Sequence, residues 1–354
     1  LTLCLVSSFL FLGGSLFAQV PGMMTMQPAS VPQGTDLGAN NTVNAAGIAL
    51  GNRVKLRGFV DFAYAYGDLN AHSDMNSSKK DARFQTAADL DLLFDFSPVT
   101  GEIHLQASTE EIGLEQAFIR YSFNRDFSLS LGRQLTPLSY EGDESPQLLS
   151  TSHAYFSDAL FANEAFGDAK DVLLQATGLN TTFDSNNSST LRRNYVDGIR
   201  ANFNNGRFGL TIGLHDGYWV DDDFNKNNIA VDIAASLMII PGLEARLGYA
   251  HQNTESTAAE DDIQHLNAWV EYNPGNLTLA FEYDNFDVLG TDIWDIMLLG
   301  NYQFSQLFGL TLKYAHEDIE KGSLNIDSDR ISLALLFSIT DQFGFNIEYS
   351  HTEF

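Results

Sequence analysis

Apolar and polar residues alternate with a period of two along most of the chain after residue 53. The segment 277–284 reads LTLAFEYD, so apolar or aromatic side chains occupy every second position, and the segments 308–315 (FGLTLKYA) and 331–339 (ISLALLFSI) repeat this pattern. Such alternation over about ten residues is typical of a barrel strand with lipid on one face and water on the other. The pattern therefore predicts membrane-spanning β-strands rather than helices.

The connections between the predicted strands fall into two classes. The short ones contain hairpin-forming residues such as Asn-Gly and Pro-Gly, and they lie at 97–100, 124–126, 204–206, 241–242, 273–275, 305–306 and 340–342. The long ones are polar and acidic, and they lie at 67–80, 135–192, 216–227, 253–263 and 319–327. Outer-membrane barrels have short periplasmic turns and longer outer loops. The sequence thus predicts an all-β fold, a transmembrane antiparallel up-and-down β-barrel.

About fifteen strands are expected, and they begin near residues 53, 83, 101, 114, 127, 194, 207, 229, 243, 264, 276, 292, 308, 328 and 343. Single-chain bacterial barrels have an even number of strands, so we expect sixteen in the intact protein. A further strand at 172–177 (VLLQAT) would move the earlier and later short turns to opposite sides of the membrane. We therefore expect that the chain stops one strand short, and that Phe354, out of step with the last apolar face, does not close the barrel.

The start of the chain has the pattern of a secretion signal. An apolar run is followed by small residues and by Leu-Phe-Ala before Gln19, as in a signal core and its cleavage site. We predict a signal peptide at 1–18, a flexible periplasmic lead-in at 19–50 and the barrel at 51–354. Beyond the signal no apolar run approaches the ~18–20 residues of a membrane helix, which leaves a closed barrel as the way to span a bilayer.

Composition removes several classes of function. The net charge of -27, from 46 acidic and 19 basic residues, argues against nucleic-acid binding. The single cysteine, Cys4, lies in the predicted signal, so disulfides and cysteine-based zinc sites are excluded from the barrel. The histidines are scattered, and neither H-E-x-x-H nor G-x-S-x-G is present, so no enzyme activity, metal or cofactor is predicted. The acidic triplets 221–223 and 260–262 would suit Ca²⁺ or a divalent bridge to lipopolysaccharide, with solvated loop tips as the simpler interpretation.

One stretch resembles a known family. Residues 114–146 (LEQAFIRYSFNRDFSLSLGRQLTPLSYEGDESP) resemble Gram-negative porins, in which such a hairpin leads into the long third loop. The segment Thr136–Glu141 (TPLSYE) looks most like the putative β-barrel porin family called OmpL-like, which has Gly where this chain has Ser139. The first strand, RGFVDFAYAY (57–66), is also similar to that of many porins. The resemblance implies a pore-forming outer-membrane homotrimer whose loop after the fifth strand folds toward the lumen and narrows it.

Two groups of charged residues are candidates for the pore. The constriction set lies in the long loop and contains Tyr140, Glu141, Asp143 and Glu144. The pore-lining set comes from the predicted inward faces and contains Arg53, Lys55, Arg57, Asp61, Asp89, Asp91, Asp95, Glu102, His104, Arg120, Glu282, Asp284 and Lys313. Facing acidic and basic clusters would produce a field across the pore, and an acid-dominated lumen favours cations. The alternative is that the loop charges are simply solvated and that the inward residues pair with each other.

These observations favour an outer-membrane porin of a Gram-negative bacterium that passes small hydrophilic solutes and prefers cations. Its expected partners are outer-membrane lipid and lipopolysaccharide, small polar solutes or ions, and further copies of the chain. Three alternatives stay open. They are a substrate-specific channel, a non-conducting barrel that binds through acidic surface loops, and a barrel-wall enzyme, for which we find no Ser/His or acid/His cluster. Outward aromatic residues near the strand ends predict girdles at the two membrane interfaces.

Overall fold

The strands of the computed structural model belong to one sheet. The structure describes residues 2–11, 48–49, 53–69, 79–107, 112–142, 148–155, 157–158, 191–192, 195–217, 219, 229–253, 262–288, 290–340 and 343–353. In these ranges no helix is long and apolar enough to cross a membrane. The strands are β1 (Thr2–Phe11), β2 (Ile48–Ala49), β3 (Val54–Leu69), β4 (Lys79–Phe96), β5 (Val99–Ala107), β6 (Ile112–Ser122), β7 (Phe127–Leu135), β8 (Tyr195–Asn204), β9 (Phe208–His215), β10 (Ala230–Ile240), β11 (Leu243–Gln252), β12 (Ile263–Tyr272), β13 (Leu277–Val288), β14 (Thr291–Ser305), β15 (Phe308–Lys321), β16 (Leu324–Thr340) and β17 (Phe343–Glu353).

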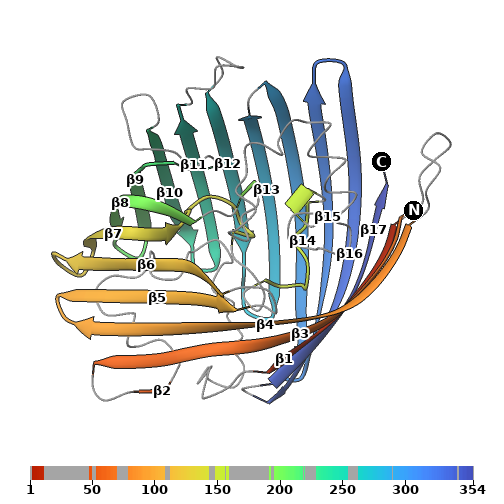
Figure 1. Cartoon of the computed structure of the whole chain (residues 1–354), viewed down its shortest axis with the longest axis horizontal. Helices are drawn as coiled ribbons and strands as arrows, with labels where there is room; N and C mark the ends of the chain where they lie inside the picture. The colour runs from red at the N-terminus through yellow and green to blue at the C-terminus, as the bar shows by residue number, and fades with distance from the viewer. Residues whose placement is uncertain are drawn as a thin grey trace.

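From β3 to β17 each strand pairs antiparallel with the next, which is an up-and-down topology. These fifteen strands confirm the fifteen predicted from the alternation, and all but two begin within two residues of the predicted position. The exceptions are β4 and β16, which each begin four residues earlier. Figure 1 shows the strands β3–β7 and β10–β16 as two walls that cross, with segments of the long loop between them.

The fifteen strands leave the sheet open between β17 and β3, which do not pair with each other. The segment β1 lies in this gap and pairs antiparallel with both neighbours, so that Leu5 is opposite Tyr349 and Tyr66. One strand therefore fills the gap. The assignment of 1–18 as a signal, 19–50 as a lead-in and 51–354 as the barrel stays a prediction. The segment 172–177, the triplet 221–223, Glu260, Asp261 and Phe354 lie outside the described residues.

The distribution of apolar and polar side chains between the two faces of the sheet is the reverse of that in a soluble protein. On β13, Leu279 and Phe281 are 46% and 39% exposed, whereas Glu282 and Asp284 are fully buried. The same alternation runs along the neighbouring strands, where large apolar residues point outward and polar ones point inward. Charged residues are almost never buried in a soluble core unless they are paired. The arrangement is the one expected where lipid surrounds the sheet and polar groups line its inner face.

Outward aromatic rings gather near both ends of the strands. At the short-turn end, Tyr302, Phe304, Phe308, Phe337 and Phe345 contact one another in sequence, with ring centroids 4.6–5.4 Å apart. At the other end of β14 lies Trp294, which is 39% exposed. Trp294 and Tyr302 are eight positions apart, and at about 3.4 Å per residue and a tilt of about 40° this spans roughly 20 Å across the membrane. This spacing supports the predicted girdles.

One predicted long loop is absent. Residues 319–327 were expected to form an acidic loop, but β15 continues to Lys321 and β16 begins at Leu324, so the chain reverses in a tight turn at Gly322 (φ 61°). Ile319 and Ile326 are opposite each other in this hairpin and pack on the buried apolar cluster at the same end of the sheet. Burial of these two side chains stabilises paired strands where the acidic composition alone suggested a loop.

Candidate pore constriction

The long loop after β7 passes along the inner face of the sheet, as predicted. The chain leaves the wall at Leu135, whose carbonyl oxygen accepts a hydrogen bond from Arg200 Nη1 at 2.8 Å and whose N–H donates to Gln116 Oε1 at 3.1 Å. The described loop residues up to 158 then contact β12–β17. These contacts use polar side chains of the wall and both backbone and side-chain groups of the loop.

Tyr140 is the first anchor of the loop. Its N–H donates to Glu282 Oε1, its hydroxyl donates to Glu271 Oε2 at 2.6 Å, and its ring meets that of Trp269 edge-on at 5.6 Å. Burial raises the pKa of the Tyr140 phenol well above its usual value, and the Glu271 carboxylate adds to the effect. The phenol therefore stays a hydrogen-bond donor over the physiological pH range.

The second anchor contains equal numbers of cationic and carboxylate side chains. Lys313 on β15 pairs with Glu141 at 2.9 Å and donates to Ser150 Oγ at 2.7 Å. Glu348 on β17 accepts from the backbone N–H of Thr151 at 2.7 Å. It also accepts hydrogen bonds from the N–H and hydroxyl of Ser152, and Arg330 donates to that hydroxyl at 3.1 Å. Two cations and two carboxylates thus hold this part of the loop.

Arg192 forms the third anchor, where the long loop returns toward β8. Its guanidinium donates to Asp158 at 2.7 Å, to Asp284 at 3.2 Å and to Asp295, and it lies 3.7 Å from the ring centre of Tyr155. Although burial lowers the pKa of Arg192, the carboxylates of Asp158, Asp295 and Asp284 hold it well above its usual value. One arginine therefore joins two parts of the loop to β13 and β14.

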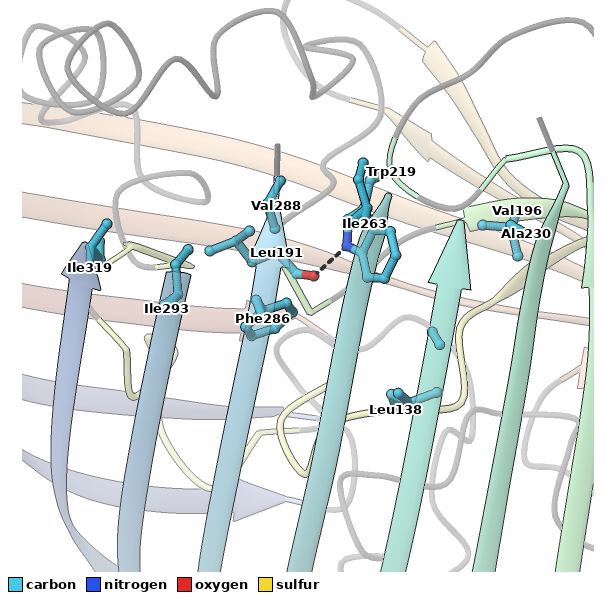
Figure 2. Close-up of a cluster of buried hydrophobic side chains, with 11 residues drawn as sticks. Leu138, Leu191, Val196, Trp219, Ala230, Ile263, Phe286, Val288, Ile293 and Ile319 are labelled. Atoms are coloured by element: carbon cyan, nitrogen blue, oxygen red, sulfur yellow. Dashed lines mark hydrogen bonds between the residues drawn. The ribbon is translucent and has the colours of Figure 1, made fainter. Parts of the chain in front are cut away.

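An apolar cluster covers the inner wall beyond Arg192. Leu191, Phe286, Val288 and Ile293 are fully buried there, and the indole N–H of Trp219 donates to the carbonyl oxygen of Leu191 at 2.9 Å. Figure 2 shows these side chains gathered at the ends of β10–β15 with the Trp219–Leu191 hydrogen bond between them. Arg192 is buried beside this cluster, 5.0 Å from the ring centre of Phe286, and ion pairs are stronger in such an environment than in water.

A second charged cluster occupies the inner face of β3–β6. Asp91 on β4 pairs with Arg57 on β3 and lies 2.8 Å from His104 Nδ1 on β5, while His104 Nε2 lies 2.9 Å from Glu102 on the same strand. Arg120 on β6 is 3% exposed. Side chains of opposite charge therefore meet within this cluster. Like the loop anchors, this cluster supports the alternative that inward residues pair with each other.

The structure brings together some of the predicted residues and not others. Glu282, Asp284 and Lys313 contact the loop, and Arg57, Asp91, Glu102 and His104 form one cluster. Lys55, Asp61 and Asp89 are half-buried on the same inner wall. Asp95 lies at the short-turn end, where it accepts from the Ser97 N–H at 2.9 Å. Arg53 does not join the inner clusters, because it is exposed and its guanidinium lies 5.7 Å from the outward-facing ring of Phe96.

The predicted constriction residues that the structure describes face the wall. Tyr140 and Glu141 are 1% and 3% exposed, so they anchor the loop instead of presenting their polar groups to solvent. Asp143 and Glu144 lie outside the described residues. Arg192, Asp295, Glu317 and Glu348 were not among the predicted site residues. Asp295 and Glu348 were open to detection because each lies between apolar neighbours that point outward. Glu317 lies between His316 and Asp318, and Arg192 lies at the end of the predicted long loop, so neither has a periodic signal.

Ser139 stands where the resembled OmpL-like family has Gly. It has a φ of 81°, in the left-handed region that favours glycine, and its fully buried hydroxyl has no hydrogen-bond partner among the described residues. We expect Ser139→Gly to stabilise the docked loop by about 1 kcal/mol, because glycine adopts this conformation without steric cost. Hydrogen exchange of the loop amides measures the gain. Ser139→Ala keeps the backbone strain, so an equal gain from alanine would contradict this account.

Comparisons with known proteins agree on the architecture. No family model matches the chain, and no curated protein matches it. Among solved structures, OmpF of Salmonella typhi, determined with daunomycin, aligns at 12% identity and a TM-score of 0.56, covering 86% of this chain and 98% of that one. The anion-selective porin from Comamonas acidovorans aligns at 15% identity and a TM-score of 0.54, covering 85% and 99%. The chain has the fold of an outer-membrane porin. At these identities the likeness concerns the porin fold alone, and membership of the OmpL-like family stays a prediction.

Proposed function

We propose that this porin-fold chain is an outer-membrane channel that lets small hydrophilic solutes diffuse passively past the inward-folded loop. One observation carries the proposal. The outer face of the sheet is apolar, the inner face is polar and charged, and the loop after β7 is fastened to that inner face by Tyr140, Lys313 and Arg192. A chain that only spanned the bilayer would not need a charged interior, because burying ions is costly.

We further propose a preference for cations, based on the charges of this chain. The predicted lining set contains seven carboxylates, five lysines or arginines and His104. Part of that set is neutralised by pairing, as in the Arg57–Asp91 and Lys313–Glu141 ion pairs. The predicted loop residues Asp143 and Glu144 would add negative charge at the narrowest point. Rings of charged side chains set the selectivity of such pores.

The cellular setting belongs to the same proposal. A location in the outer membrane of a Gram-negative bacterium is supported by the apolar outer face and by its aromatic rings at the short-turn end. Outer-membrane lipid and lipopolysaccharide would then surround the sheet. A homotrimer is proposed from the porin resemblance alone. We propose a channel and not an enzyme, because carboxylates engage the inner-face histidines His104, His215 and His265.

Recording from single molecules in a planar bilayer tests the channel and its selectivity. We expect stepwise, ohmic conductance. In a salt gradient, we expect the sign of the reversal potential to indicate a preference for cations. Asp143→Asn with Glu144→Gln should shift this potential toward zero, because two negative charges leave the constriction. Asp126→Asn, in an exposed short turn, is the matched control and should leave it unchanged. Protein that inserts but never conducts would refute the channel, and an unchanged potential in the double variant would refute the role of the loop acids.

One observation favours the alternative of a non-conducting surface-binding barrel. The buried cluster around Trp219 and Leu191 covers part of the inner wall at the long-loop end. It therefore reduces the open cross-section of the lumen at that end. The same bilayer recording separates the two functions, since a filled lumen would give insertion without conductance. A substrate-specific channel would instead conduct and be blocked by its solute.

A further inference from the structure

Buried carboxylates outnumber buried cations around Arg192. The acidic side chains are those of Asp158, Glu282, Asp284, Asp295 and Glu317, and each residue is at most 1% exposed. The side chains of Arg192 and His265 are 2% and 0% exposed. The groups that face one another are Tyr155, Asp158 and Arg192 from the loop, His265 and Asn267 from β12, Glu282 and Asp284 from β13, Asp295 from β14 and Glu317 from β15. Five carboxyl groups therefore meet two cations, even when His265 is counted as protonated.

This imbalance has a physical consequence. An unpaired buried carboxylate is so costly that the group takes up a proton instead. Among the described residues, Oδ1 of Asp295 has no hydrogen-bond partner, so this side chain has one oxygen able to carry a proton. Asp284, by contrast, is satisfied by Arg192, His265 and Asn267.

Two of the loop groups in the cluster, Arg192 and Tyr155, do not change charge near neutrality. Arg192 stays charged because its three carboxylate partners outweigh the effect of burial on its pKa. Burial raises the pKa of Tyr155 well above its usual value, so this phenol stays neutral. Proton uptake therefore falls on the carboxyl groups that meet at Arg192, and three of the five come from β13 and β14.

The neighbouring anchor lacks this imbalance. There Lys313 and Arg330 face Glu141 and Glu348, so two cations meet two carboxylates. The two anchors hold parts of the same loop to the same wall, and they differ in their charge balance. That difference supplies an internal control.

We propose that Arg192 and its five carboxyl groups form a proton-dependent clamp, in which docking of the loop on the wall takes up protons and deprotonation weakens the docking. Because the docked loop binds more protons than the released loop, lower pH favours docking and higher pH favours release. The clamp regulates the constriction of the proposed channel, and its effect on conductance rests on that function, whereas the docking itself does not.

Hydrogen exchange of the loop amides in 148–158, corrected for intrinsic rates, tests the clamp in the full chain between pH 5 and pH 8. We expect protection at low pH that is lost as pH rises. Asp295→Asn, which is nearly isosteric and permanently neutral, should keep protection to a pH higher by about one unit or more. Glu348→Gln, in the balanced anchor, should lower protection without moving the midpoint. Glu317→Gln replaces Asp295→Asn if that variant does not fold.

Wild-type protection that does not change with pH would overturn the clamp, as would a midpoint that neither Asp295→Asn nor Glu317→Gln moves. Parallel bilayer recordings keep the two proposals apart. A conductance that rises with pH at the exchange midpoint supports both. Protection that depends on pH in a protein that never conducts supports the clamp and refutes the channel. Ohmic conductance with protection independent of pH refutes the clamp and leaves the channel in place.

Discussion

Arg192→Met should release the long loop from the wall and raise the single-channel conductance. The substitution removes the guanidinium that joins Asp158 in the loop to Asp284 and Asp295 on the wall, and it leaves the buried carboxylates of Asp158 and Asp295 without their cation. Breaking a buried ion pair on one side costs about 3–5 kcal/mol. Because the loop can undock while the strands stay paired, we expect this cost to appear as loop release and not as loss of the sheet.

Limited proteolysis of the folded protein measures that release. A docking loss of about 3 kcal/mol raises the population of the open loop roughly a hundredfold, and the cleavage rate should follow it. Arg133→Met is the matched control, because Arg133 also pairs with an aspartate, Asp197 at 3.1 Å, but does so at the outer face of β7 and β8. Equal protection of the loop in wild type and Arg192→Met would contradict the role assigned to Arg192.

Leu298→Arg should destabilise the folded protein by about 2–4 kcal/mol, because it places a charge at the middle of the lipid-facing surface. Leu298 is central on β14 and 50% exposed on the outer face. In a soluble protein an arginine at such an exposed site changes stability by about 0.5 kcal/mol or less. Equilibrium unfolding by urea in lipid vesicles measures the difference.

The control for this prediction lies on the same face of the same strand. Asp292→Arg changes a residue at the long-loop end of β14, six positions from Leu298, where the headgroup region reaches the strand. Charged residues near the interface cost about 0–1 kcal/mol. A similar loss for both arginines, or no loss for either, would show that hydrocarbon does not bathe this surface.

The strands and their faces were predictable because alternation is a local property. Each residue of β13 from Leu277 to Val288 points opposite to its neighbour, so the sequence itself indicates which side chains meet lipid. The error at 319–327 has the opposite origin. Its acidic residues suggested a loop, and the pairing of Ile319 with Ile326 could be recognised only with the apolar cluster in place.

The candidate site was predictable in its composition and not in its contacts. The TPLSYE segment indicated where the chain enters the interior, and Glu282, Asp284 and Lys313 were assigned inward from their positions in the alternation. No local pattern indicated that Lys313 would meet Glu141, 172 residues earlier, or that Tyr140 and Glu141 would face the wall.

By itself, the sequence determined the strands, their order and their two faces, since these depend on a backbone period of two and on turn residues close together in the chain. The tertiary structure decided which inward charges pair, because curvature of the sheet brings β12–β17 around the loop. It also decided the role of Arg192, whose partners lie 34, 92 and 103 positions away. The cost of buried charge makes those partners necessary, and only the folded chain shows which residues they are.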